Sequence, residues 1–231
     1  TKMVKTVPSY TGTLRSHSLS LPHCVSECSG IRIFGKRIKS LAFTTDVAIV
    51  KNINADAVIA VYPFTPQQII ADAIVSTSSL PVFCGVGGGT TTGARVVMLA
   101  KDAEAFGAMA VVVNAPTTND VIAQIADIID IPIVVTVLDE NTDIDARLEA
   151  GATIFNVSAA ARTPEVVRIL RERYPDLPII ATGGPSKESI RETVAAGANA
   201  ISFTPPTAEE LFHGLMTRYR NEHESKTKGE A

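Results

Sequence analysis

The feature that most constrains the fold is a set of short apolar runs that recur along the chain. They begin near residues 39, 56, 81, 108, 132, 152, 178 and 200, so consecutive runs lie 17, 25, 27, 24, 20, 26 and 22 residues apart. The runs are nearly continuous in Val, Ile, Ala and Leu, which is typical of parallel strands covered on both faces. Each interval leaves room for one helix, so the pattern predicts eight βα units.

The runs begin with two alternating signatures. One consists of small residues, as in "GAMAVVVNA" from Gly107, and the other starts with an aliphatic residue and proline, as in "IPIVVTVLD" from Ile131. In the intervals between the runs, apolar residues recur at the spacing of an α-helix. It predicts helices over 66–77, 93–107, 119–130, 144–151, 164–176, 187–197 and 208–222.

Eight strand–helix pairs in this order predict an α/β protein that closes into a (βα)8 TIM barrel over residues 39–222. An open doubly wound sheet is the weaker alternative, because the interior layers of a barrel are filled by alternate strands, as the two signatures suggest. Residues 1–38 form an N-terminal arm and a hairpin, "IRIFGKRI" (31–38), which is expected to cap the barrel bottom. The last nine residues, 223–231, lack apolar content and are expected to be disordered.

Charge and cysteine content restrict the partners. The 21 basic and 24 acidic residues are interspersed and sum to −3, which argues against nucleic acid and membrane partners. No long apolar run or basic leader occurs, so a cytoplasmic location is expected. Cys24, Cys28 and Cys84 are expected to be reduced thiols, and a zinc site at the first two is disfavoured because no second ligand pair supports it.

In a (βα)8 barrel, the active site lies where the strands end and the following loops begin. Asp46 follows the first run, and Asp139 and Glu140 follow the fifth. These three carboxylates are the candidates for acid–base catalysis, with Tyr62 or Cys84 as a helper, because no histidine or strand lysine lies at that end. Each has a structural alternative, since Asp46 can cap a helix and the other two can belong to a solvated loop.

A second candidate site is Thr182-Gly183-Gly184, followed by Ser186 at the start of a helix. Two glycines before a helix expose backbone N–H groups, which suits phosphate. The stretch "IIATGGPSKESIRETVAAGANAISF" (179–203) resembles the phosphate-binding (βα)8 barrels, which include ribulose-phosphate-binding enzymes, keto-deoxy-phosphogluconate-type aldolases and FMN-dependent oxidoreductases.

That resemblance implies that a phosphate is held by the glycines after the seventh strand and by a Gly-Ser or Gly-Thr pair after the eighth. This chain has Thr204-Pro205-Pro206-Thr207 at the second position, and proline offers no N–H group. The hydroxyls of Thr204 and Thr207 are the expected substitutes. Separately, "VFCGVGGGTTTG" with "VVVNAPT" is similar to short bacterial proteins known only as hydrolases or as barrels without a known reaction.

The glycine run "PVFCGVGGGTTTG" (81–93) matches neither common nucleotide motif. Thr90 occupies the place of the third glycine of a dinucleotide loop, and Ala94 replaces the lysine of a nucleoside-triphosphate loop. As a loop at the barrel mouth, it is expected to contact a ligand through Gly87, Gly88, Gly89 and Thr90.

Three polar residues interrupt apolar runs near their ends: Asn114, Asn156 and Ser158. Buried amides are costly unless they are paired. We expect them to bind a ligand at the mouth, with a hydrogen-bond network between strands as the alternative.

The sequence therefore favours a small-molecule enzyme that acts on a phosphorylated substrate by lyase, isomerase or hydrolase chemistry. An FMN-dependent oxidoreductase, with the flavin ring near Gly87 to Gly89, and a non-catalytic metabolite sensor are the alternatives. No motif requires a cofactor or a metal, although FMN is possible. A homodimer is a further possibility for a barrel of this size.

Overall fold

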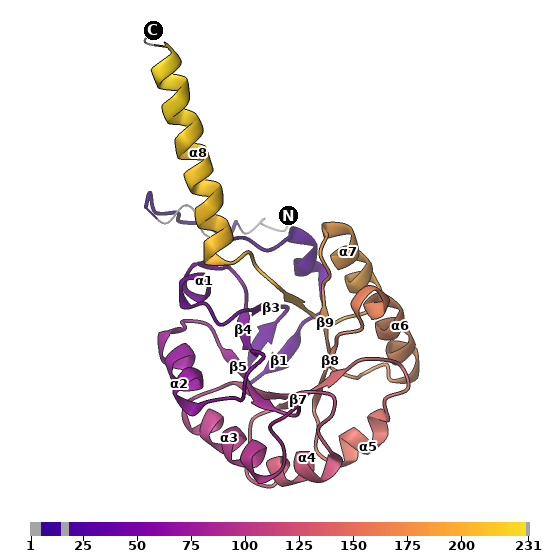
Figure 1. Cartoon of the computed structure of the whole chain (residues 1–231). Coiled ribbons are helices and arrows are strands. Elements are labelled where there is room, and N and C mark those ends of the chain that lie inside the picture. Colours follow the sequence, from indigo (N-terminus) through magenta and orange to yellow (C-terminus); the bar gives the residue numbers. More distant parts are fainter. Residues whose placement is uncertain (1–5, 15–18, 230–231) are drawn as a thin grey trace.

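Eight parallel strands close into a barrel in the order β10-β3-β4-β5-β6-β7-β8-β9, and helices surround it (Figure 1). The computed structural model describes residues 6–14 and 19–229. The barrel strands are β3 (Ser40–Phe43), β4 (Ala57–Ala60), β5 (Val82–Gly87), β6 (Ala110–Val113), β7 (Ile133–Val137), β8 (Ile154–Val157), β9 (Ile179–Thr182) and β10 (Ala200–Phe203). Every expected apolar run forms a strand, which confirms the (βα)8 barrel.

The helices that follow the strands are shorter than the sequence predicts, except for the last. They are α1 (Val47–Asn52), α2 (Gln68–Thr77), α3 (Ala94–Ala105), α4 (Asn119–Ala126), α5 (Ile144–Glu149), α6 (Thr163–Arg173), α7 (Lys187–Ala195) and α8 (Ala208–Gly229). Two 3-10 turns, η1 (His23–Glu27) and η2 (Ala160–Arg162), complete the list. No helix of the described residues is long and apolar enough to cross a membrane.

The barrel interior is filled by aliphatic and aromatic side chains at its N-terminal and middle levels. Leu41, Ile59, Phe83, Val134 and Ile180 belong to one buried cluster. Residues on either side of them in each strand point outward and pack under the helices, as the two-residue period of a strand requires. The interior is therefore a packed core, and a ligand can enter only at an end.

A hairpin of β1 (Ile31–Ile33) and β2 (Lys36–Ile38) lies at the N-terminal end. Its turn residues Phe34 and Gly35 both have positive φ, 45° and 82°, as a tight hairpin turn requires. Ile31, Ile33 and Ile38 are buried in the same cluster as the barrel interior. The hairpin thus occupies the interior from below and leaves the opposite end for polar groups.

The arm before the hairpin does not continue under the barrel. The segment 19–28 lies on the outer side of the barrel between α1 and α7. Leu19 exchanges hydrogen bonds with Asn52 and Asn54 after α1, and η1 packs on α7. Cys24, Val25 and Cys28 are buried there, in a cluster with outward-facing Ile201 of β10. The segment 19–28 therefore covers the side of the barrel between the first and the seventh helix.

Helix α8 leaves the barrel instead of packing on it, and it points away from the body of the molecule (Figure 1). It begins with a capping box, in which the Thr207 N–H donates to Glu210 (2.8 Å) and the Glu210 N–H donates to Thr207 Oγ1 (3.1 Å). The sequence predicts disorder from residue 223, whereas α8 runs to Gly229. A lack of apolar residues argues against packing, but it does not break a helix that contains no proline or glycine between residues 215 and 228.

Asn199 ties three parts of the fold together. Its Oδ1 accepts hydrogen bonds from the N–H of Ile179 in β9 (2.8 Å) and from Arg171 of α6 (2.7 Å), and its Nδ2 donates to Ser29 of the arm (2.8 Å). Arg171 also donates to the Gly197 carbonyl (3.0 Å). The network anchors the arm and helix α6 to the start of β9.

The Asn199→Ala variant is expected to lower the free energy of unfolding by about 2 to 3 kcal/mol, because the Ile179 N–H and the Arg171 guanidinium lose their acceptor. Chemical denaturation monitored by circular dichroism measures this change. Asn52→Ala is the control, since the Asn52 side chain makes one exposed bond to the Ala48 carbonyl. Equal stability of the two variants would contradict an anchoring role for Asn199.

Candidate functional site

Polar side chains line the interior of the barrel at the C-terminal ends of four adjacent strands. Thr136 of β7 and Asn156 of β8 are register partners, and each follows an interior core residue by two positions. Thr182 of β9 and Ser202 of β10 are also register partners with the same relation to the core. Because side chains two residues apart share a face of a strand, all four point into the barrel. We call these residues the polar arc.

The polar arc is only partly satisfied by the protein. Ser202 is 5% exposed, and the other three side chains are half-buried. The Asn156 Oδ1 atom is buried and has no hydrogen-bond partner in the described part of the chain. A buried amide oxygen without a donor is unfavourable. A hydrogen-bond donor from outside the protein would therefore be favourable at this end of the interior.

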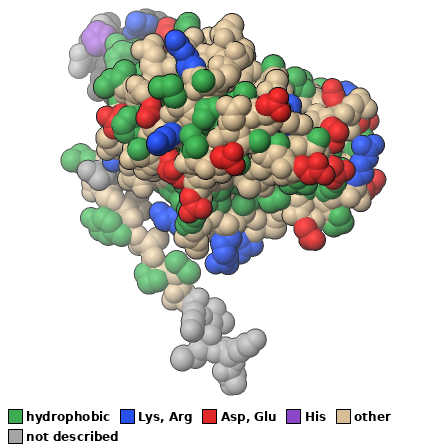
Figure 2. All heavy atoms as spheres, turned by 90° about the horizontal axis from the view of Figure 1, so that it is seen from below, with side chains coloured by type: hydrophobic (Ala, Val, Ile, Leu, Met, Phe, Trp, Pro, Cys, Tyr) green, Lys and Arg blue, Asp and Glu red, His purple; other side chains and the backbone are tan. Residues whose placement is uncertain are grey.

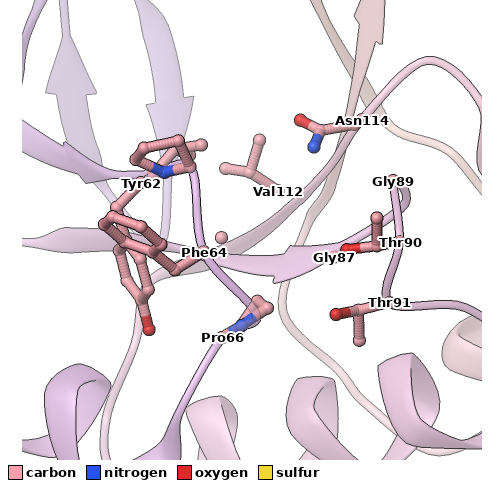
Figure 3. Close-up of a pocket in the computed structure, with 12 residues that line it drawn as sticks. Tyr62, Phe64, Pro66, Gly87, Gly89, Thr90, Thr91, Val112 and Asn114 are labelled. Carbon is pink, nitrogen blue, oxygen red and sulfur yellow. The ribbon is translucent and has the colours of Figure 1, made fainter.

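The opposite half of the mouth is a pocket of about 250 Å³. Figure 3 shows its two walls, with the loop after β4 on one side and the glycine loop after β5 on the other. The first wall consists of Tyr62, Pro63, Phe64 and Pro66, the second of Gly87, Gly89, Thr90 and Thr91, and Val61, Gly85, Val112 and Asn114 complete the lining. Tyr62 holds its own loop in place, because its hydroxyl accepts a hydrogen bond from the Gln67 N–H (2.9 Å).

The glycine loop needs its glycines for different reasons. Gly87 and Gly88 have φ of 132° and 104°, which side chains rarely adopt. A Cβ on Gly88 would lie 2.1 Å from Thr117 Oγ1 and 2.8 Å from the Asn114 backbone nitrogen. A Cβ on Gly89 would have nothing within 4 Å. Gly88 is therefore required for the loop to fold, whereas Gly89 and exposed Thr90 face the open pocket.

The loop after β9 is explained largely by packing and capping. A Cβ on Gly183 would lie 2.8 Å from Ile201 and 2.9 Å from Ile190, and the Gly183 N–H donates to the Ser202 carbonyl (3.0 Å). Gly184 has a φ of 78°. Ser186 caps α7 as predicted: its Oγ accepts a hydrogen bond from the Ser189 N–H, and its own N–H donates to Ser189 Oγ (both 3.1 Å).

Three N–H groups at this end of α7 remain available. The N–H groups of Gly184, Lys187 and Glu188 have no acceptor within the described residues. They lie at a helix N-terminus that directly follows Thr182 of the polar arc, and a helix N-terminus favours negative charge.

Two of the three candidate carboxylates have structural roles. Asp46 caps α1, since its Oδ1 accepts hydrogen bonds from the N–H groups of Ala48 (2.8 Å) and Ile49 (3.3 Å). Asp139 accepts from the N–H of Asn141 (2.8 Å) in its own turn.

Glu140 is held differently. Its Oε1 lies 2.8 Å from an Arg162 nitrogen, while its Oε2 is buried without a hydrogen-bond partner among the described residues. The hydrogen bond from Arg162 lowers the pKa of Glu140, so this carboxylate is ionised at neutral pH. Arg162 also bonds Glu165 (3.0 Å), which fixes the guanidinium between two carboxylates.

The barrel does not bring the three carboxylates together. Asp46 follows β3, whereas Asp139 and Glu140 follow β7, and three strands lie between these positions around the ring in either direction. Within the residues that the structure describes, no three His, Cys, Asp or Glu side chains are grouped as metal ligands. A carboxylate cluster is therefore not the organising feature of this mouth.

The remaining candidates lie at the mouth to different degrees. Asn114 is exposed in the pocket wall, Ser158 is half-buried after β8, and Thr204 is exposed beyond β10. Cys84, the suggested helper, faces outward into the core beneath the helices and not into the mouth. Sequence reasoning missed Ser202, because a single serine within "AISF" gives no signal until the register shows that it points inward.

Comparison with known proteins places the fold but not a specific family. No family model matches the chain. It is 28% identical over 93 residues to the thiamine-phosphate synthase of Oceanobacillus iheyensis, which covers 40% of this chain and 39% of the synthase. The matched segment thus spans about two fifths of that relative.

Solved structures with the same architecture include several enzymes. Phosphonopyruvate hydrolase has a TM-score of 0.60 at 14% identity and covers 89% of this chain and 86% of its own. Phosphoenolpyruvate phosphomutase from Streptomyces platensis subsp. rosaceus has a TM-score of 0.58 at 15% identity, with 82% and 83% covered. At such identities the likeness defines a class, the (βα)8 barrels, and the likeness to known barrels expected from the sequence is confirmed at that level.

Alanine substitutions at two neighbouring glycines of the glycine loop are expected to differ in their effect on stability. Gly88→Ala is expected to lower the free energy of unfolding by about 2 kcal/mol or more, because the new Cβ meets backbone and Thr117 at a positive φ. Gly89→Ala is expected to change it by less than about 0.5 kcal/mol. Thermal and chemical denaturation measure both, and an unaltered stability of Gly88→Ala would show that the loop has another conformation.

Cys84 is expected to resist alkylation in the folded protein. Burial raises the pKa of its thiol to about 12 and that of Cys28 to about 11, so both are protonated at pH 8 and the reactive thiolate is scarce. Iodoacetamide treatment followed by peptide mass spectrometry should leave both unmodified until denaturant is added. Rapid labelling of Cys84 in the native protein would mean that β5 opens to solvent.

Proposed function

We propose that this protein is an enzyme that acts on a small molecule carrying a phosphate or carboxylate group, bound at the C-terminal mouth of the barrel. The observation that carries the proposal is the polar arc of Thr136, Asn156, Thr182 and Ser202 in an otherwise apolar interior. A core that served only stability would be filled with apolar side chains at these positions.

The anionic group is assigned to the β9 side of the mouth. The N–H groups of Gly184, Lys187 and Glu188 at the start of α7 have no acceptor in the described structure, and Thr182 ends the strand from which this loop leaves. Thr204, beyond the adjacent strand β10, supplies a further hydroxyl from the segment that lacks the second glycine pair. Gly183 and Ser186 support this loop by packing and capping rather than by binding.

The remainder of the ligand extends toward the pocket between the β4 and β5 loops. In the ring of strands, β5 lies opposite β9, so a ligand held by both loops crosses the mouth above the polar arc. Thr90 and Asn114 supply polar contacts in the pocket, and Tyr62 and Phe64 supply an aromatic wall. Ser158 lies at the rim next to the arc.

Glu140 is the residue proposed for proton transfer. It is the one candidate carboxylate with a buried oxygen that no group in the described structure satisfies, and its lowered pKa keeps it in the anionic form that can accept a proton or stabilise a positive charge. Arg162 positions it. Asp46 and Asp139 are not assigned catalytic roles, because their oxygens cap backbone N–H groups.

The reaction class is a lyase, mutase or hydrolase. Support comes from the structural neighbours, whose names include a phosphonopyruvate hydrolase, a phosphoenolpyruvate phosphomutase and a 2,3-dimethylmalate lyase.

A metal site is not part of the proposal, because the carboxylates of the mouth are dispersed. The buried and free state of all three cysteines agrees with a cytoplasmic protein.

The Asn156→Leu variant tests the proposal. Leucine has a similar shape without polar atoms, so stability should stay equal or rise by up to about 1 kcal/mol, because an unsatisfied buried oxygen is removed. Binding of inorganic phosphate, phosphonopyruvate or thiamine phosphate, measured by calorimetry, should weaken about tenfold or more for whichever of them the native protein binds. A loss of stability together with unchanged binding would assign Asn156 to the fold alone.

Small molecules released from gently purified native protein give the second readout. A phosphorylated or carboxylated metabolite in the mass spectrum supports the proposal, whereas a flavin, with its visible absorbance, would replace it with the oxidoreductase alternative. Binding without turnover of any member of a substrate panel would favour a metabolite sensor.

A further inference from the structure

Helix α8 cannot pack in the usual place on its own barrel. In the other βα units, the helix after each strand covers the outer side of the barrel. On the side between α7 and α1, the place of an eighth helix is filled by segment 19–28, whose Cys24 and Val25 are buried against α7 and β10. No other helix or strand of the described chain packs along α8, which extends for 22 residues, about 33 Å.

Helix α8 nevertheless carries an apolar stripe. Leu211, Phe212, Leu215, Met216 and Tyr219 recur at intervals of three and four residues, so they share one side of the helix. Leu211 is 40%, Phe212 64% and Tyr219 50% exposed, while Leu215 and Met216 are half-buried. An isolated helix of this length is marginal in water, and most helices gain their stability by burying such a stripe. The stripe therefore calls for a partner surface.

Charges beside the stripe indicate what the partner is. Glu209 and Arg220 are 11 residues apart, about three helical turns, so they lie on the same flank of the stripe. When two copies of one helix pack antiparallel, each flank faces the same flank of the partner, and positions equidistant from the crossing point meet. The pairing that crosses near Gly214 and Leu215 sets Glu209 of each copy against Arg220 of the other.

We propose that α8 is a dimerisation helix, which pairs antiparallel with α8 of a second copy of this chain through the apolar stripe. The two-fold arrangement buries Leu211, Phe212, Leu215 and Tyr219 at the seam and forms the Glu209–Arg220 pair twice. A helix whose two ends carry opposite charges complements itself, whereas a lipid surface would require a uniformly basic polar face.

Segment 19–28 and helix α8 have different roles in this arrangement. Because segment 19–28 covers each barrel, α8 is free to extend outward, and because α8 begins right after Thr204 to Thr207, the dimer contact is continuous with the loop after β10. The proposal does not depend on the proposed enzyme activity.

Charge exchange on the full-length protein tests this arrangement. Analytical ultracentrifugation is expected to give a dimer for the native chain. Glu209→Arg or Arg220→Glu alone should raise the dimer dissociation constant about tenfold, because each variant sets like charges together twice in the dimer. The double variant carrying both exchanges should restore dimerisation to near the native value.

Glu172→Arg and Arg168→Glu serve as matched controls, since both residues are exposed on α6 and change the net charge equally. They should leave the dissociation constant unchanged. Phe212→Ser should also weaken the dimer while circular dichroism shows a folded barrel. A monomeric native protein, or a dimer that resists both single exchanges and Phe212→Ser, would overturn the proposal, as would single-variant dissociation that the double variant does not reverse.

Discussion

Closure of the eight-stranded ring is the constraint on which the rest of the structure depends. Each strand is hydrogen-bonded on both sides, so no edge is left, and side chains alternate between an interior and a helix-covered exterior. The interior has room only for packed side chains such as Leu41, Phe83 and Ile180. With the hairpin of Ile31 and Ile33 filling the lower end, polar groups that point inward can lie only at the upper mouth.

This division explains the unequal halves of the mouth. Over β7 to β10, the interior positions are Thr, Asn, Thr and Ser, and one buried amide oxygen has no partner. Over β4 to β6, Val61, Gly85 and Val112 leave space for a small pocket beneath two loops. The proposed ligand, with an anionic end and a less polar remainder, would contact both halves. On the face that Figure 2 presents, acidic and basic side chains are interspersed.

The route of the chain outside the barrel has an equally local cause. The segment 19–28 buries Cys24, Val25 and Cys28 on the side of the barrel between α7 and α1. Helix α8 then has no place on its own barrel and projects with Leu211, Phe212 and Tyr219 exposed. The position of segment 19–28 between α7 and α1 thus explains both its own burial and the exposure of the last helix.

The sequence by itself determined the eight strands and their parallel order, because apolar runs, their spacing and helix caps such as Ser186 and Thr207 are local patterns. It also predicted the hairpin over residues 31–38 and the position of the glycine loop at the barrel mouth. The roles within the site needed the tertiary structure. Sequence could not separate Gly88, which lacks room for a Cβ, from Gly89, which faces open space, nor show that Asp46 is a cap and Ser202 points inward. These distinctions depend on contacts between residues far apart in the chain, and only the closed barrel brings those residues together.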